Sequence, residues 1–323
     1  MKFAFLFLVA GLVVAAPLAR AQPSPPPAPL TNTSATAATL DPAAATRAWL
    51  ETVPAEKRAK SDAYFEGRYW LILWNLLLGA AVAIFLLASG LSARMRDFTE
   101  RITRSKILRP ALYAVPYVVI VYLLSFPLLV YSGFLREHAY GLANQSFGPW
   151  FGEQLIELTL EVVISGLLMM ALYAVFRRAP RAWWLWGSAL GVLFLAVQML
   201  ISPVFIAPLF NTYKPLSDPK ISQPILAMAS ANQIPVRQVF EVDASRQHKR
   251  VSANVSGLFG TTRISLNDNL LKQCTLPEIR AVMAHEMGHY VLNHAFKLIL
   301  YFGLFVAGAF AFSYLFFERA IRR

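Results

Sequence analysis

The chain has 323 residues, of which 57% are hydrophobic and 15% are charged, and its formal net charge is +12. This composition is too apolar for an ordinary soluble domain and indicates a membrane protein. The basic excess does not indicate nucleic-acid binding, because the positive residues lie in short clusters between apolar segments. A single cysteine, Cys274, excludes an internal disulfide framework.

Two N-terminal segments are predicted to contribute nothing to a folded core. Residues 1–21, MKFAFLFLVAGLVVAAPLARA, have a basic second residue, a short apolar stretch and an Ala-Arg-Ala ending. This is the pattern of a signal peptide cleaved after Ala21, and an uncleaved anchor is the alternative. Residues 22–46 are rich in Pro, Ala and Thr, which predicts a disordered linker.

Five apolar segments are long enough to cross a membrane as helices. One of them, residues 155–176, carries Glu157 and Glu161 in its first two turns, near the interface or facing the protein interior. We predict a membrane domain over residues 47–210 with about four spans, and a final span with a basic tail over residues 295–323. The other four segments lie between Arg68 and Arg94, Arg109 and Arg136, Arg181 and Lys214, and Lys297 and Glu318.

The largest polar stretch, residues 214–280, predicts a small α+β domain. It contains a helix near residues 219–232, a strand over residues 237–243 and a hairpin that turns near Gly257. A last helix starts at Thr275, because Thr275-Leu-Pro-Glu278 is a capping box with proline in the first turn.

That last helix carries His285, Glu286 and His289 in the order His-Glu-x-x-His. Residues four apart share one helix face, so the two imidazoles can bind one zinc ion. Glu286 lies on the adjacent flank, where it can take a proton from a water that the metal has activated. The pattern predicts a zinc metalloendopeptidase, with Glu286 catalytic and His285 and His289 as metal ligands.

Catalytic zinc needs a third protein ligand, and no residue of the chain is expected to supply it. His294 would lie opposite His285 on a continuous helix, which favours a hydrogen-bonding residue at the membrane edge. Asp243, Asp268 and Glu278 are expected to be turn, strand-end and cap residues, and Glu318 should emerge on the far side of the bilayer. We therefore expect weak zinc binding and inefficient hydrolysis.

Three stretches resemble the type I CAAX prenyl endopeptidases, which are integral-membrane zinc metalloproteases. They are SPVFIAPLFNTYKPLSD, TTRISLNDNLL and LPEIRAVMAHEMGHYVLNH. The resemblance implies membrane helices around a water-filled chamber, a cytoplasm-facing catalytic domain and a third ligand from a glutamate on a later helix. On this basis we expect the 323 residues to be a fragment of a longer protease.

The resemblance also implies a substrate-binding strand, which the family marks with an Asn-Ala pair. Here the stretch reads Ser252, Ala253, Asn254 and Val255, and the register leaves either Ser252 or Asn254 at the asparagine position. An edge strand of this kind can bind an extended peptide through its free main-chain groups.

The predicted fold class is mostly α, with multi-pass membrane helices and a small α+β zincin-like catalytic domain over residues 211–294. The predicted cofactor is zinc, and the predicted partners are a peptide or membrane-protein substrate and the lipid bilayer, with no nucleic acid. We expect a multi-pass protein of the bacterial inner membrane. The positive-inside rule favours an external catalytic domain, whereas the resemblance favours a cytoplasmic one. A non-catalytic receptor or scaffold with a degenerate metal site is the alternative function, and a transporter or channel is a third.

Overall fold

The structure is a computed structural model of the chain and describes residues 41–257 and 260–321. The predicted signal peptide and residues 22–40 of the predicted linker lie outside this description. The described chain divides into two parts, residues 41–81 and residues 82–321.

The first part consists of helix α2 and most of helix α3. α2 (Pro42–Glu51) starts at Asp41, whose side chain accepts a hydrogen bond from the Ala43 N–H at 2.9 Å. Residues 42–46, predicted to end the linker, are therefore helical, because an aspartate N-cap followed by proline supports a helix start. α3 (Ala55–Ala88) has 34 residues and passes from a charged to an apolar sequence.

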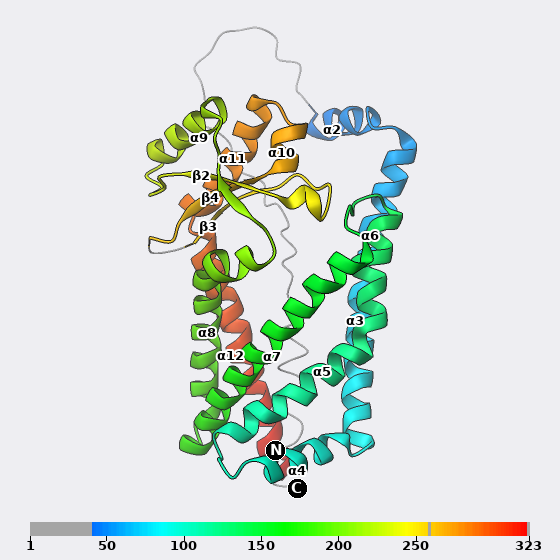
Figure 1. Cartoon of the computed structure of the whole chain (residues 1–323), viewed down its shortest axis with the longest axis vertical. Coiled ribbons are helices and arrows are strands. Elements are labelled where there is room, and N and C mark those ends of the chain that lie inside the picture. Colours follow the sequence, from blue (N-terminus) through cyan, green and yellow to red (C-terminus); the bar gives the residue numbers. More distant parts are fainter. Residues whose placement is uncertain (1–40, 258–259, 322–323) are drawn as a thin grey trace. The chain divides into compact units, whose positions relative to one another are not determined.

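Five helices of the described residues are long and apolar enough to cross a membrane, which confirms the prediction of a multi-pass membrane protein (Figure 1). Two of them continue through short turns, η1 (Tyr131–Leu135) and η2 (Ser202–Ile206), which are π-helical. The spans are α3, α5 (Leu108–Val130) continued by η1 and α6 (Arg136–Ala139), α7 (Phe147–Arg178), α8 (Trp183–Ile201) continued by η2 and η3 (Ala207–Leu209), and α12 (His294–Ile321).

The basic cluster that follows α3 is largely helical. It forms helix α4 (Leu91–Ile102), in which Met95 and Thr99 are buried and share one face. Because residues four apart lie on the same side of a helix, this spacing buries one face and leaves the arginines on the other. Three arginines of this basic cluster, Arg94, Arg96 and Arg101, therefore belong to an amphipathic helix.

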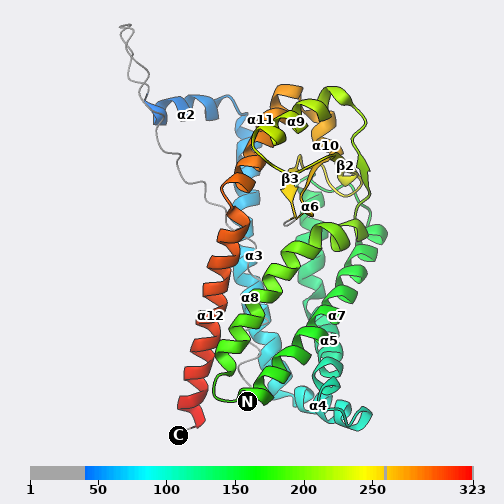
Figure 2. The ribbon, with the colours of Figure 1, turned by 90° about the vertical axis from the view of Figure 1, so that its left-hand side faces the viewer.

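Helices α8 and α12 pack side by side, as do α5 and α7 (Figure 2). Gly187 allows the α8–α12 approach, because an added Cβ would lie 2.5 Å from a ring carbon of Phe310. Close contacts at small residues are the usual way in which membrane helices associate.

The polar stretch folds into a four-stranded sheet covered by helices. The strand order is β1-β2-β4-β3, with β2 and β4 parallel and the other two pairs antiparallel. The predicted helix, strand and hairpin are found as α9, β2 and β3–β4. The elements are β1 (Tyr213–Pro215), α9 (Pro219–Ala231), β2 (Val239–Val242), η4 (Ala244–Arg246), β3 (Ala253–Ser256), β4 (Arg263–Asn267), α10 (Asp268–Gln273) and α11 (Leu276–Val291).

One hydrophobic core joins the sheet to α9 and α11. Ile264 and Leu266 of β4 point into it, as do Ile225 of α9 and Met283 and Met287 of α11. Each of these side chains is almost fully buried, so the core holds the histidine-bearing helix against the sheet. The small α+β domain on a mostly helical membrane protein agrees with the predicted fold class.

Candidate active site

Helix α11 begins where the capping box predicts. The Thr275 N–H donates to the Glu278 carboxylate at 2.7 Å, and the Thr275 hydroxyl lies at the same distance from that oxygen. These hydrogen bonds hold the pKa of Glu278 below its usual value. The cap fixes the first turn of the helix and therefore the direction in which its later side chains point.

The two faces of α11 have opposite roles. Met283 and Met287 are buried in the core, and His285 and His289, each two residues further on, lie about 200° away around the helix. Both histidines are exposed, and Glu286 between them is half-buried on the flank. The core contacts of α11 therefore present the histidine pair on the side facing away from the core.

The two imidazoles converge through the same ring atom. His285 Nε2 and His289 Nε2 lie 3.0 Å apart, close to the separation of about 3.3 Å expected for two ligands of one tetrahedral zinc ion. The structure thus brings the predicted ligands together, and the pair fits a zinc ion by atom type and spacing.

His294 contradicts the expectation that it lies opposite the histidine pair. α11 ends at Val291, Asn293 adopts a left-handed backbone with φ of 55°, and His294 begins α12. This turn brings His294 Nδ1 to 2.6 Å from His289 Nδ1. His294 therefore contacts the His289 ring nitrogen that faces away from His285, and the continuous-helix argument failed because the helix breaks.

The upstream carboxylates have the structural roles that were predicted for them. Asp243 accepts from the Thr212 N–H at 2.8 Å, Asp268 accepts from the Ser245 N–H at 2.7 Å, and Glu278 caps α11. Within residues 41–257 and 260–321, no group of three or more His, Cys, Asp or Glu side chains is placed to hold a metal.

The predicted substrate strand is an edge strand of the sheet. β3 pairs with β4 on one side, and no described strand pairs with its other side. The Ser252 carbonyl accepts from the Asn267 N–H at 3.0 Å, so the main chain of Ser252 faces β4. Since this direction alternates along a strand, the main-chain groups of Ala253 and Val255 face the free edge. α11 packs against β3, so the edge lies beside the histidine helix.

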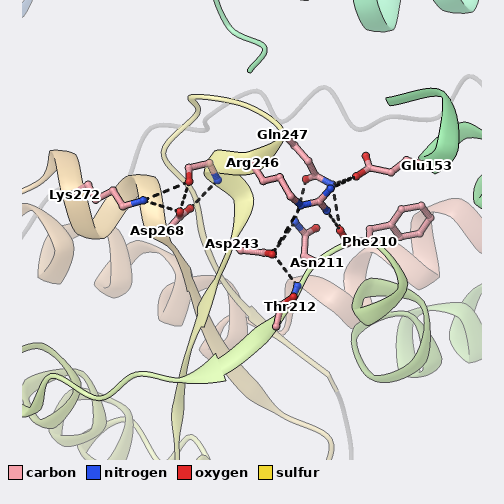
Figure 3. Close-up of polar contacts among 10 residues, drawn as sticks. Glu153, Phe210, Asn211, Thr212, Asp243, Arg246, Gln247, Asp268 and Lys272 are labelled. Atoms are coloured by element: carbon pink, nitrogen blue, oxygen red, sulfur yellow. Dashed lines mark hydrogen bonds and ion pairs between the residues drawn. The ribbon is translucent and has the colours of Figure 1, made fainter. Parts of the chain in front are cut away.

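A polar network attaches this domain to the membrane helix α7 (Figure 3). Glu153 of α7 accepts from Arg246 at 3.0 Å and from Gln247 at 2.9 Å. Gln247 in turn accepts from the Asn211 side chain at 3.1 Å. The segment that leads into β3 is thereby fixed to the start of α7. Sequence reasoning missed this network, because Glu153 is more than 90 residues from Arg246 and Gln247 and no local pattern links them.

Two family descriptions match almost the whole described chain. Residues 41–212 match "CAAX prenyl protease N-terminal, five membrane helices", and residues 215–322 match "Peptidase family M48".

Individual relatives and a solved structure agree with these matches. The chain is 29% identical to the "Uncharacterized metalloprotease YhfN" of Bacillus subtilis over 238 residues, which are 74% of this chain and 56% of the relative. It is 32% identical to "CAAX prenyl protease 1" of Saccharomyces cerevisiae over 182 residues, which are 55% of this chain and 40% of the relative. The crystal structure of S. mikatae Ste24p shares the fold, with a TM-score of 0.69 and 24% identity over 79% of this chain and 62% of that one.

The chain spans about half the length of the curated relatives it matches. The match to the membrane-helix region alone covers more than half of the chain. The protein therefore belongs to the CAAX prenyl protease family, within the membrane metalloproteases of peptidase family M48.

Proposed function

We propose that the chain forms the catalytic centre of a membrane zinc metalloendopeptidase that cleaves peptides or membrane proteins near the bilayer surface. The observation that carries this proposal is the 3.0 Å approach of His285 Nε2 and His289 Nε2 on a helix that packs against a free strand edge. Membership of a metalloprotease family supports the assignment of zinc to the histidine pair.

His285 and His289 would hold the metal through Nε2. Zinc, when bound there, would act as a Lewis acid and lower the pKa of a water molecule to about 7. Glu286 then takes the proton of the attacking water as its oxygen bonds to the peptide carbonyl carbon. When the C–N bond breaks, Glu286 delivers that proton to the leaving nitrogen.

Substrate orientation falls to β3. An extended peptide would pair with the outward-facing N–H and C=O groups of Ala253 and Val255, adding a strand to the sheet. Ser252 and Asn254 would then contribute side chains rather than main-chain hydrogen bonds. All four residues of the predicted substrate strand would therefore contact the peptide, and two of them would do so through the main chain.

The test measures zinc content and peptide hydrolysis of the purified chain in detergent. Glu286→Gln should bind zinc normally and lose at least about a hundredfold in turnover, because proton transfer is removed and the ligands remain. His285→Ala should lose zinc and turnover together.

Glu278→Gln, the same substitution on the same helix, is the matched control and should keep turnover, because glutamine also completes a capping box. Glu286→Gln with more than a few per cent of wild-type turnover would contradict the proposal.

A further inference from the structure

A second polar site lies between the membrane helices and the sheet domain, and neither His285 nor His289 lines it. It is a cavity of about 330 Å³ between the end of the α5 span, the start of α7 and the segment that precedes β3. Gly133 and Phe134 of the π-helical turn η1 line one side of it. Such π-helical turns are frequent at functional sites.

The walls of the cavity are fixed by hydrogen bonds and ion pairs. Glu137 pairs with Arg250, and Glu153 binds Arg246 and Gln247, so two of the lining carboxylates already have partners within the protein. The main chain joins the two sides as well, since the Asn144 N–H donates to the Gln247 carbonyl at 2.9 Å. A cavity with walls held in this way needs little rearrangement to receive a ligand.

Two lining groups are available to a ligand: the amide of Gln145 lacks a hydrogen-bond acceptor, and the carboxylate of Glu157 lacks a cationic partner. Gln145 is 7% exposed, and its Nε2 has no hydrogen-bond acceptor among the residues that the structure describes. A buried donor without an acceptor is unfavourable by about 1–3 kcal/mol. Glu157 also lines the cavity; it shares a hydrogen bond with Gln154 but forms no ion pair within the described part of the chain. The cavity therefore offers one hydrogen-bond donor and one carboxylate to a ligand.

The charge around the cavity favours a cation. The lining residues include three carboxylates, Glu137, Glu153 and Glu157, but only one arginine, Arg250, so acidic side chains outnumber arginines by two. Burial first, and the neighbouring Arg250 second, lower the pKa of His248, so this histidine adds no positive charge at pH 7. Trp150 and Phe210 provide aromatic walls, which also favour a cationic group.

The cavity lies at the start of the predicted substrate strand. Arg250 lines it, and Ala253, the first residue of β3, follows three residues later, about 10 Å along an extended chain. A peptide bound along β3 can therefore extend into the cavity. One residue of such a peptide supplies both missing partners, a positive side chain for Glu157 and a carbonyl oxygen for Gln145.

We propose that this cavity is a specificity subsite for a lysine or arginine side chain of the bound peptide. Glu157 pairs with the cationic group and Gln145 donates to the carbonyl oxygen of the peptide. The proposal rests on the proposed peptide binding by β3 but needs neither zinc nor hydrolysis. A phosphate-bearing lipid headgroup is disfavoured by the net negative charge of the walls.

The experiment measures peptide binding to the full chain carrying Glu286→Gln, so that no substrate is cleaved. Fluorescence anisotropy compares peptides that carry a lysine at successive positions with the same peptides carrying Nε-acetyl-lysine. At one position the lysine peptide should bind about five- to tenfold more tightly, as expected for a partly desolvated ion pair. Adding Glu157→Gln should abolish that preference.

Glu161→Gln is the matched control, since it removes the same charge one helical turn further along α7, outside the cavity, and should keep the preference. Gln145→Ala should weaken the binding of the lysine peptide and of the acetyl-lysine peptide by the same factor. Equal binding of lysine and acetyl-lysine peptides at every position, or no binding of either, would overturn the proposal. The proposal would also be overturned if the protein showed no lysine preference but bound glycerophosphoethanolamine, and if Glu157→Gln abolished that binding. This result would assign the cavity to a lipid headgroup. None of these outcomes depends on turnover, so they are distinguishable from failure of the proposed catalysis.

Discussion

The imidazole of His289 has two nitrogens with different neighbours. Nε2 faces His285, and Nδ1 lies 2.6 Å from His294 Nδ1. If the Nδ1–H of His289 donates to His294, the ring is held with Nε2 directed at the metal. Ligating histidines usually have such a partner on the second nitrogen, and its removal weakens metal binding about 10- to 100-fold.

We therefore predict that His294→Ala weakens zinc binding by about 10- to 100-fold, whereas His294→Gln, which keeps an acceptor, restores part of it. Competition with a chromogenic chelator gives the dissociation constant for zinc. His138→Ala, a histidine substitution in another helix, serves as the control. An unchanged dissociation constant in His294→Ala would remove the positioning role, and complete zinc loss in both variants would make His294 a ligand.

Asp268 links α10 to the η4 turn and gives a pH-dependent prediction. Burial raises its pKa, but hydrogen bonds from Ser245 and Lys272 outweigh burial and hold the pKa below its usual value. A lowered folded-state pKa stabilises the fold above the unfolded pKa of about 3.9, and this contribution is lost as pH falls through the folded value.

Asp268→Asn should therefore lower the free energy of unfolding by about 1.5–3 kcal/mol at pH 7, with the difference shrinking below about pH 4. Thermal unfolding in detergent at fixed scan rate measures it at both pH values. Asp218→Asn is the control, because asparagine caps a helix as well as aspartate does. A difference that is the same at pH 7 and pH 3 would contradict the assigned role of the carboxylate.

At the scale of single elements, the β3–β4 hairpin depends on Gly257. Its φ is 92°, and an added Cβ would lie 2.2 Å from the Thr261 carbonyl oxygen. Gly260 has a similar φ of 90° but nothing within 4 Å of an added Cβ. The two glycines therefore separate the effect of a close contact from that of backbone conformation.

Gly260→Ala should lower the free energy of unfolding by about 1 kcal/mol, because alanine tolerates a positive φ poorly. Gly257→Ala should lower the free energy of unfolding by about 3 kcal/mol or more, since the clash with the main chain adds to that strain. It should also weaken peptide binding, because the hairpin carries the substrate edge. Thermal unfolding and the anisotropy assay measure both effects, and equal costs for the two variants would show that the hairpin relaxes around the new side chain.

The elements that sequence patterns predict are the ones specified locally. The capping box of α11, the strand β2 and the β3–β4 hairpin each follow from residues close together in the chain. The parallel pairing of β2 with β4 and the cavity bounded by Glu137 and Arg250 do not, because they join distant segments. The break at Asn293 was missed for another reason: a left-handed asparagine between two helical patterns leaves no strong signal.

At the scale of the whole membrane domain, the basic residues that follow α4, those at the end of α7 and Arg319 of α12 gather at one end of the helices. Arg177 donates to the Lys106 carbonyl at 3.0 Å, which joins the start of α5 to the end of α7. Trp183, at the start of α8, contacts Phe310 and Tyr314 in the second half of α12. Arg319 therefore belongs to the same end, and the sheet domain follows the opposite end of α8.

Because short basic segments stay in the cytoplasm, this arrangement predicts that the sheet domain faces the side of the membrane away from the cytoplasm. Cys274 lies just before α11 and is half-buried, so it reports on that face. A membrane-impermeant maleimide should label it in cells whose outer barrier has been opened. Arg178→Cys in a Cys274→Ser background is the matched control at the basic end and should be labelled only after lysis. The reverse labelling pattern would place the sheet domain in the cytoplasm, as the family resemblance implies. If Cys274 is labelled in denatured lysate but not in native lysate, it is inaccessible in the folded protein. Ser252→Cys, at the exposed start of the substrate edge, then replaces it as the labelled site.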